Sequence, residues 1–139
     1  MASERVTLKD ILRSIADDKS LLLINTIAEL EQDSRRLKGI GQLTKKQYYS
    51  RLSNLLKCGL VTRRHGKYHL SSFGKVVCAF NLEISNALNY FWELKALDSI
   101  NEANTKEIKE VDSYSKLIDS FIHDAKIKEF LVTSRSSSN

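Results

Sequence analysis

The spacing of apolar residues changes twice in the middle of the chain, and no other feature limits the fold as much. Residues 45–57 carry their apolar side chains at steps of three and four, which predicts one amphipathic helix. Residues 60–70 abandon this spacing: two short segments, 60–64 and 67–70, flank His65-Gly66, and Tyr68 and Leu70 alternate with polar residues, which predicts a short β-hairpin with a tight turn. The helical spacing returns at Phe73. We therefore expect a small hairpin framed by two helices.

The segments on either side of this centre predict helices and no further strand. The chain has no proline, so nothing interrupts a long helix. The apolar pattern slips near His123-Asp124, so the last helical segment is either one helix or two. Residues 133–139 are polar and are expected to be disordered. The other expected helices are a short one that starts at Thr7, with Asp10 as its capping partner, and segments 19–30, 33–40, 73–99 and 106–131.

Composition indicates an ordinary folded protein. Of the 139 residues, 42% are hydrophobic and 28% are charged, which is typical of a globular domain. The apolar runs, such as Leu21 to Ile24, are too short for a bilayer, and the N-terminus lacks a secretion signal, so the cytoplasm is the expected location. Neither zinc spacing, nor a nucleotide-binding loop, nor a catalytic arrangement of Ser, His and Asp occurs. We therefore expect no metal, no cofactor, no catalytic residue and no enzymatic activity.

The charge distribution is strongly uneven. Residues 34–82 contain eleven Lys and Arg and no Asp or Glu, whereas the other eleven basic residues share the rest of the chain with all seventeen acids. Ordinary protein surfaces mix both signs. A folded segment of one sign suits a polyanionic partner, because each neutralised phosphate releases condensed counterions. Two consecutive helices with a short connection, the second basic on its outside, are typical of a helix-turn-helix.

One continuous stretch carries a family resemblance. It reads TKKQYYSRLSNLLKCGLVTRRHGKYHLSSFG, residues 44–74. Its order is Leu52 and Leu55, then Gly59-Leu60-Val61, a basic turn, Tyr68-x-Leu70 and Ser-Ser-Phe-Gly. This order resembles the winged helix-turn-helix regulators of the ArsR and MarR type, and most of all their compact archaeal single-domain forms.

The resemblance implies a mainly α fold with a small β-hairpin wing. Residues 1–75 would form the DNA-binding domain, residues 76–132 a helical extension for dimerisation, and residues 133–139 a tail. The recognition helix, 45–57, would enter the major groove of duplex DNA, and the wing, 61–69, would contact the backbone or the minor groove. The implied DNA-binding residues are Lys45, Lys46, Gln47, Tyr49, Ser50, Arg51, Ser53, Asn54, Lys57, Arg63, Arg64 and Lys67.

Individual roles follow from side-chain chemistry. Gln47 and Asn54 can pair with adenine and Lys46 with guanine, whereas Arg51 and Lys57 suit phosphates. Tyr48 is expected in the core. Tyr49 either contacts DNA, by stacking on a base or covering a phosphate, or is a plain surface residue. A further basic group ahead of the turn could reach the DNA backbone; it consists of Arg35, Arg36 and Lys38.

Apolar residues from Phe73 to Leu94 recur at alternating steps of four and three, which is a heptad seam. The seam either packs on the chain's own helices or pairs with a second copy. It is longer than a small winged domain needs, so we expect a homodimer. The expected interface residues are Phe80, Ile84, Phe91, Trp92, Leu94, Leu117 and Phe121.

Together these patterns predict a homodimeric transcription regulator that binds specific sites in double-stranded DNA and no membrane. The alternative is a winged-helix interaction module that docks on an acidic protein partner, since the same basic face would serve. No polar cluster marks a pocket for a small-molecule effector, which stays unassigned.

Overall fold

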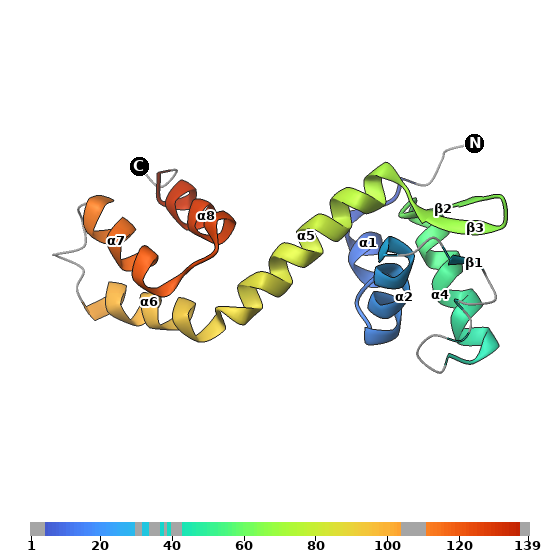
Figure 1. Ribbon diagram of the computed structural model, residues 1–139, viewed down its shortest axis with the longest axis horizontal. Coiled ribbons are helices and arrows are strands. Elements are labelled where there is room, and N and C mark those ends of the chain that lie inside the picture. The colour runs from blue at the N-terminus through green and yellow to red at the C-terminus, as the bar shows by residue number, and fades with distance from the viewer. Residues whose placement is uncertain are drawn as a thin grey trace. The chain divides into compact units, whose positions relative to one another are not determined.

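The computed structural model describes residues 5–29, 32–33, 37, 39, 43–103 and 111–136. The described part is mainly helical and contains one small antiparallel sheet (Figure 1). The chain divides into two compact units, Met1–Ala79 and Phe80–Asn139, and this division lies within helix α5 (Ser72–Asn89). The first unit also contains α1 (Leu8–Ser14), α2 (Asp18–Glu29), β1 (Gln32–Asp33), α4 (Lys45–Lys57), β2 (Val61–Arg64) and β3 (Lys67–Leu70).

Capping boxes start two helices of the first unit. At α1, the Thr7 hydroxyl accepts from the Asp10 N–H at 3.3 Å, and the Asp10 carboxylate accepts from the Thr7 N–H at 2.8 Å. At α4, Thr44 and Gln47 exchange the equivalent bonds at 3.2 and 3.1 Å. Gly59 follows α4 with φ +73°, the left-handed conformation that commonly ends a helix. These starts and this stop agree with the sequence prediction.

The hairpin forms as predicted, with Arg64 opposite Lys67 and a two-residue turn. His65 and Gly66 have φ values of 53° and 74°, which fits the twist of an antiparallel pair. The sheet has a third strand that the pattern did not predict: Gln32–Asp33 pairs with β3, giving the order β1-β3-β2.

The expected helix over residues 33–40 therefore starts too early, because Asp33 lies in a strand. A two-residue strand is too short to produce an alternating pattern. Leu37 is helical and fully buried, as expected. Arg35, Arg36, Lys38 and Ile40 lie outside the described residues.

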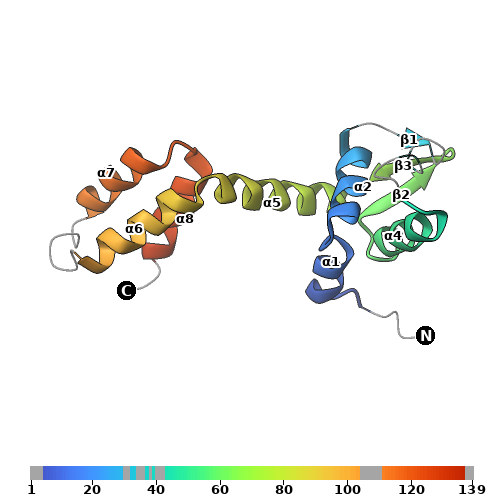
Figure 2. The same cartoon turned by 90° about the horizontal axis from the view of Figure 1, so that it is seen from below.

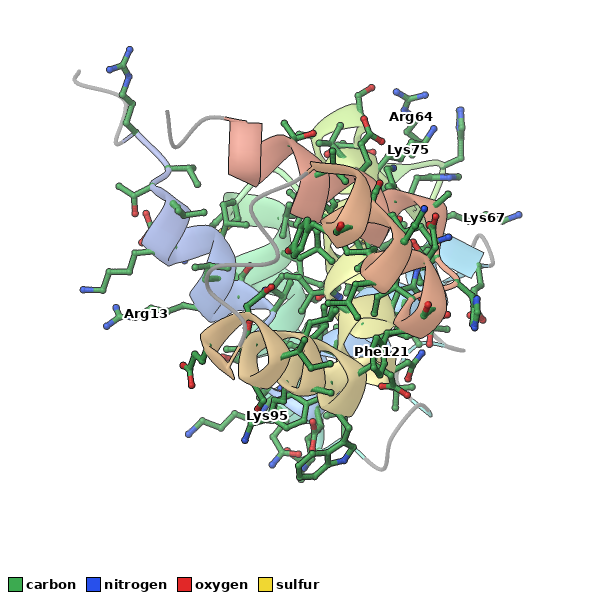
Figure 3. The ribbon with its side chains drawn as sticks, turned by 90° about the vertical axis from the view of Figure 1, so that its left-hand side faces the viewer. Arg13, Arg64, Lys67, Lys75, Lys95 and Phe121 are labelled. Carbon is green, nitrogen blue, oxygen red and sulfur yellow. The ribbon has the colours of Figure 1, made fainter. Side chains whose placement is uncertain are left out.

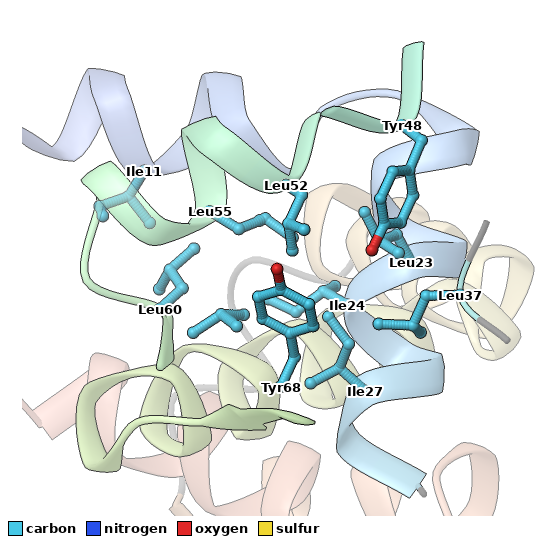
Figure 4. Close-up of a cluster of buried hydrophobic side chains, with 11 residues drawn as sticks. Ile11, Leu23, Ile24, Ile27, Leu37, Tyr48, Leu52, Leu55, Leu60 and Tyr68 are labelled. Atoms are coloured by element: carbon cyan, nitrogen blue, oxygen red, sulfur yellow. The ribbon is translucent and has the colours of Figure 1, made fainter. Parts of the chain in front are cut away.

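A single apolar core holds α1, α2, α4 and the hairpin together (Figure 4). Tyr48 from α4 and Tyr68 from β3 enter it from two sides, and Tyr48 is fully buried, as predicted. In both overall views α2 and α4 lie beside the hairpin (Figures 1 and 2). The buried members are Ile11, Leu23, Ile24, Ile27, Leu37, Tyr48, Leu52, Leu55, Leu60, Val61 and Tyr68.

The predicted helix over residues 73–99 is wrong in one respect, because it breaks at Tyr90. The Tyr90 N–H donates to the Ala87 carbonyl at 3.0 Å, a tightened last turn, and α6 (Phe91–Ala103) then begins. After the break, α6 packs Leu94 and Leu97 against the helices that follow.

Two further helices complete the second unit, α7 (Val111–Phe121) and α8 (Ala125–Ser136). The pattern slip near His123-Asp124 thus marks a break, where Asp124 Oδ1 accepts from the N–H groups of Lys126 and Ile127 at 3.0 Å each. Because α8 continues to Ser136, the disorder expected from residue 133 is wrong for its first four residues. The buried core of this unit is Leu97, Ile118, Ile122 and Ile127.

Candidate nucleic-acid interface

The outer face of α4 consists of Lys46, Ser50, Ser53 and Lys57. These residues follow one another at steps of four, three and four, directly opposite the buried side of the helix. Both lysines are exposed, and the two short serines lie between them. The arrangement leaves a helix surface that another molecule can approach closely, with a positive charge near each end.

Gln47 does not belong to this face. Its side-chain oxygen Oε1 accepts from the Thr44 N–H at 3.1 Å and from Lys19 Nζ at 3.2 Å. Pairing with adenine would require the same oxygen and would open the capping box. The predicted base-reading role of Gln47 therefore conflicts with its position, and its observed role is to fix the start of α4.

Arg51 forms contacts within the chain, and its phosphate contact stays a prediction. Its Nε lies 3.1 Å from Asp17 Oδ1, and its Nη1 donates to the Gln47 carbonyl at 3.4 Å. Burial alone would raise the pKa of Asp17, but hydrogen bonds from Ser20 and Arg51 outweigh it and lower the pKa below 3.8. The pair ties α4 to the start of α2.

The three wing cations separate onto two faces of the hairpin. Arg63 pairs with Tyr68 in the register and lies over the tyrosine ring, 5.8 Å from its centroid, on the face that contains the core. Arg64 and Lys67 form the neighbouring register pair and so occupy the opposite, exposed face. Figure 3 shows their side chains extending from the end of the hairpin. Two of the three predicted wing contacts are therefore free to meet a ligand on one side.

The remaining predicted contacts lie beside the outer face of α4. Lys45 and Asn54 are exposed, one at the start of the helix and one near its end. Tyr49 is half exposed, and its ring meets the edge of Tyr48 with centroids 5.2 Å apart. The predicted backbone group of Arg35, Arg36 and Lys38 cannot be placed, as it lies outside the described residues.

The exposed cations on the outer face of α4 and at the end of the hairpin are not neutralised by described neighbours. Lys46, Lys57, Arg64 and Lys67 form no salt bridge with any residue that the structure describes. Sequence reasoning missed two other cations, Arg5 and Arg13, which line a cavity together with the end of α4. Their basic character could have indicated a binding role, but the N-terminal region as a whole also carries acids, so it does not stand out as basic in the sequence.

The residues predicted for a dimer interface also fall into two groups. Phe80, Ile84, Phe91 and Trp92 are exposed, as an interface requires. In contrast, Leu94, Leu117 and Phe121 pack against the core of their own second unit. All three are half-buried, and Leu94 also lines an apolar groove with Phe80 and Ile84, so a role of these three residues in an interface stays a prediction.

The part of the chain that the structure describes contains neither a metal-binding cluster nor a membrane-spanning helix. No cluster of three or more His, Cys, Asp or Glu that could hold a metal was found there. None of the described helices is both long and apolar enough to cross a membrane. Burial raises the pKa of the Cys78 thiol, which suits a packing role for this residue.

Comparisons with protein-family models, with curated proteins and with solved structures found no match to this chain.

Proposed function

We propose that this chain is a winged helix-turn-helix protein that binds double-stranded DNA as a homodimeric transcription regulator. The observation that carries the proposal is the outer face of α4, a capped helix whose exposed side bears lysines and serines and no carboxylate. The order of elements around it supports the same conclusion. A strand lies between α2 and α4 in the chain, a hairpin with a basic end follows α4, and the three strands form one sheet.

In this proposal α4 lies in the major groove, which is wide enough for one α-helix. Ser50 and Ser53 allow the helix to approach the base edges closely. Lys46 and Asn54 then reach guanine acceptors and adenine, respectively, because their side chains are exposed and have the required donors. Lys57 contacts a phosphate near the end of the helix.

The hairpin contributes contacts to the DNA backbone. Arg64 and Lys67 lie on one exposed face next to a rigid two-residue turn, so both can bind phosphates of a duplex. Arg63 supports them indirectly by packing over Tyr68. These contacts are independent of base sequence and raise the affinity for any duplex.

The second unit provides a surface for a second copy of the chain. Phe80, Ile84 and Leu88 follow one another at steps of four on α5 and are 61%, 66% and 69% exposed, and Trp92 is 73% exposed. Phe80 and Ile84 border an apolar groove with Phe130 of α8. At roughly 150–250 Å² for each large side chain, these five leave on the order of 600 Å² uncovered. This area is most of what a stable dimer covers, about 800 Å² per partner.

The test is selection of bound sequences from a random duplex pool, followed by binding measurements over a range of salt concentrations. We expect an inverted-repeat site with half-sites about 34 Å apart and an affinity that falls steeply with salt. A protein that binds no duplex in dilute buffer but captures an acidic protein would instead be an interaction module. That result would refute the proposal.

A further inference from the structure

A cavity of about 590 Å³ opens between α1 and the C-terminal end of α4. It lies within the first unit and is distinct from the outer face of α4, although the two share a border. α1 is fixed beside α4 because Ile11 is buried in the common core and the Cys58 thiol lies 3.7 Å from the Asp10 carbonyl. The residues that matter for its chemistry are Arg5, Asp10 and Arg13 from the α1 side and Asn54, Lys57 and Cys58 from α4.

Positive charge dominates the lining of this cavity. Arg5, Arg13 and Lys57 contribute three cations, and Asp10 is the carboxylate among the lining residues. Hydrogen bonds from the Thr7 N–H and hydroxyl, 2.8 Å each, are the main reason that the pKa of Asp10 lies below 3.8, and the charge of Arg13 adds to them. Asp10 is therefore ionised at neutral pH but committed to the α1 cap, which leaves an excess of two positive charges.

The lining is also rich in unused donors. None of Arg5, Arg13 and Lys57 forms a salt bridge with a residue in the described ranges. Figure 3 shows the Arg13 side chain extending away from the helix. An arginine offers up to five N–H donors in a planar fork that matches the oxygens of a phosphate, and a lysine adds a compact charge. An anion with several oxygens is the ligand that these groups recognise.

The position of the cavity indicates which phosphate it would hold. Asn54 and Lys57 both line the cavity. Lys57 also belongs to the outer face of α4, which we assign to the major groove, and Asn54 flanks that face. A duplex on that surface has its sugar-phosphate backbone beside the groove. We propose that the cavity is a phosphate subsite that holds a phosphodiester of the bound duplex. This inference rests on the proposed function, and it makes α1 part of the DNA interface.

The test replaces Arg13, and separately Arg5, with alanine in the full chain. Lys9→Ala is the matched control, because Lys9 is an exposed cation on the same helix that does not line the cavity. Binding to a random-sequence duplex is measured between about 50 and 200 mM salt. Each cavity variant should lower the slope of log K against log salt by about 0.9 and weaken binding roughly tenfold at low salt, whereas the control stays near wild type.

Thermal unfolding identifies a variant that fails to fold. Arg5 precedes α1, so Arg5→Ala tests the site even if Arg13→Ala disturbs the helix. Cavity variants that behave like Lys9→Ala while wild type binds DNA would overturn the inference and leave the proposed function intact. A wild-type chain that binds no duplex would instead overturn the proposed function and this assignment together.

A second arm distinguishes the duplex from a free phosphate. Inorganic phosphate is titrated into the protein alone and followed by NMR signals of the Arg13 and Arg5 side chains. Weak binding that a duplex displaces supports the backbone subsite. Tight phosphate binding that persists when duplex is bound would contradict it, because the site would then serve a small phosphorylated molecule.

Discussion

Replacing Gly74 with alanine should strongly destabilise the first unit. A Cβ atom at this position would lie 2.0 Å from the carbonyl oxygen of Leu60, and 2.9 and 3.2 Å from its carbonyl carbon and Cα. Leu60 cannot move easily, since its side chain is fully buried and its carbonyl accepts the Ser71 N–H at 2.9 Å. The first turn of α5 must therefore separate from the strand β2.

The expected cost follows from two opposing effects. Alanine favours a helix interior over glycine by about 1 kcal/mol. Overpacking against fixed backbone costs about 3 kcal/mol or more, and loss of the Ser71–Leu60 hydrogen bond adds about 1 kcal/mol. The net loss is about 3 kcal/mol, a large part of the stability of a small domain.

Urea unfolding measures this loss, and the chain supplies a convenient pair of probes. Trp92 is the single tryptophan and belongs to the second unit, so its fluorescence reports that unit, whereas far-UV circular dichroism reports both. We expect the first-unit midpoint to fall by roughly 2 M and the Trp92 transition to stay in place. Lys75→Ala, an exposed neighbour on the same turn, is the control. A Gly74→Ala variant within 1 kcal/mol of wild type, on the order of the control, would refute the docking of α5 on Leu60.

Three other predictions concern the cap of α4, the proposed dimer surface and the Asp17–Arg51 ion pair. Gln47→Ala should lower the unfolding free energy by about 0.5–1 kcal/mol, because the α4 cap is lost, while the sequences selected from a duplex pool stay unchanged. A changed sequence preference would show that Gln47 reads a base. Phe80→Asp combined with Ile84→Asp should convert a dimer to a monomer in light scattering, whereas Leu82→Asp, 60% exposed on the other side of α5, should not. The pKa of Asp17 is lower in the folded chain, so its contribution to stability is complete well above pH 3.8 and is lost as the pH falls through 3.8 and the lower folded value. Asp17→Asn should therefore make the unfolding midpoint less sensitive to acid, and an unchanged dependence of the midpoint on pH would contradict this prediction.

The regular elements could be predicted because each leaves a local signal. Capping residues, a glycine beyond the helix and the change of apolar period mark α4 and the hairpin to within a residue or two. β1 could not be predicted, since a strand of Gln32 and Asp33 exists only through its pairing with β3. The break at Tyr90 has the same origin. The heptad pattern there describes one helix, but packing against α7 and α8 decides where that helix ends.

The sequence indicates which residue types gather at the candidate site, but it does not indicate the role of each residue. Lysine, arginine and glutamine on a basic helix look equivalent in the sequence. The structure distinguishes Lys46, which lies opposite the core, from Gln47 and Arg51, which lie on the flank facing α2. A rotation of 100° between neighbouring residues separates these roles, and the partners on α2 that complete them are about 30 residues away in the chain.

The same division has a consequence for how such a protein can diverge. The two polar contacts between α4 and the start of α2, Lys19–Gln47 and Asp17–Arg51, lie on one flank of α4, and the outer face takes no part in them. Substitutions at positions 46, 50, 53 and 57 can therefore change the recognised target without lowering the stability of the first unit. Positions 17 and 51, in contrast, are tied together, and among descendants of this chain they should change as a pair or not at all.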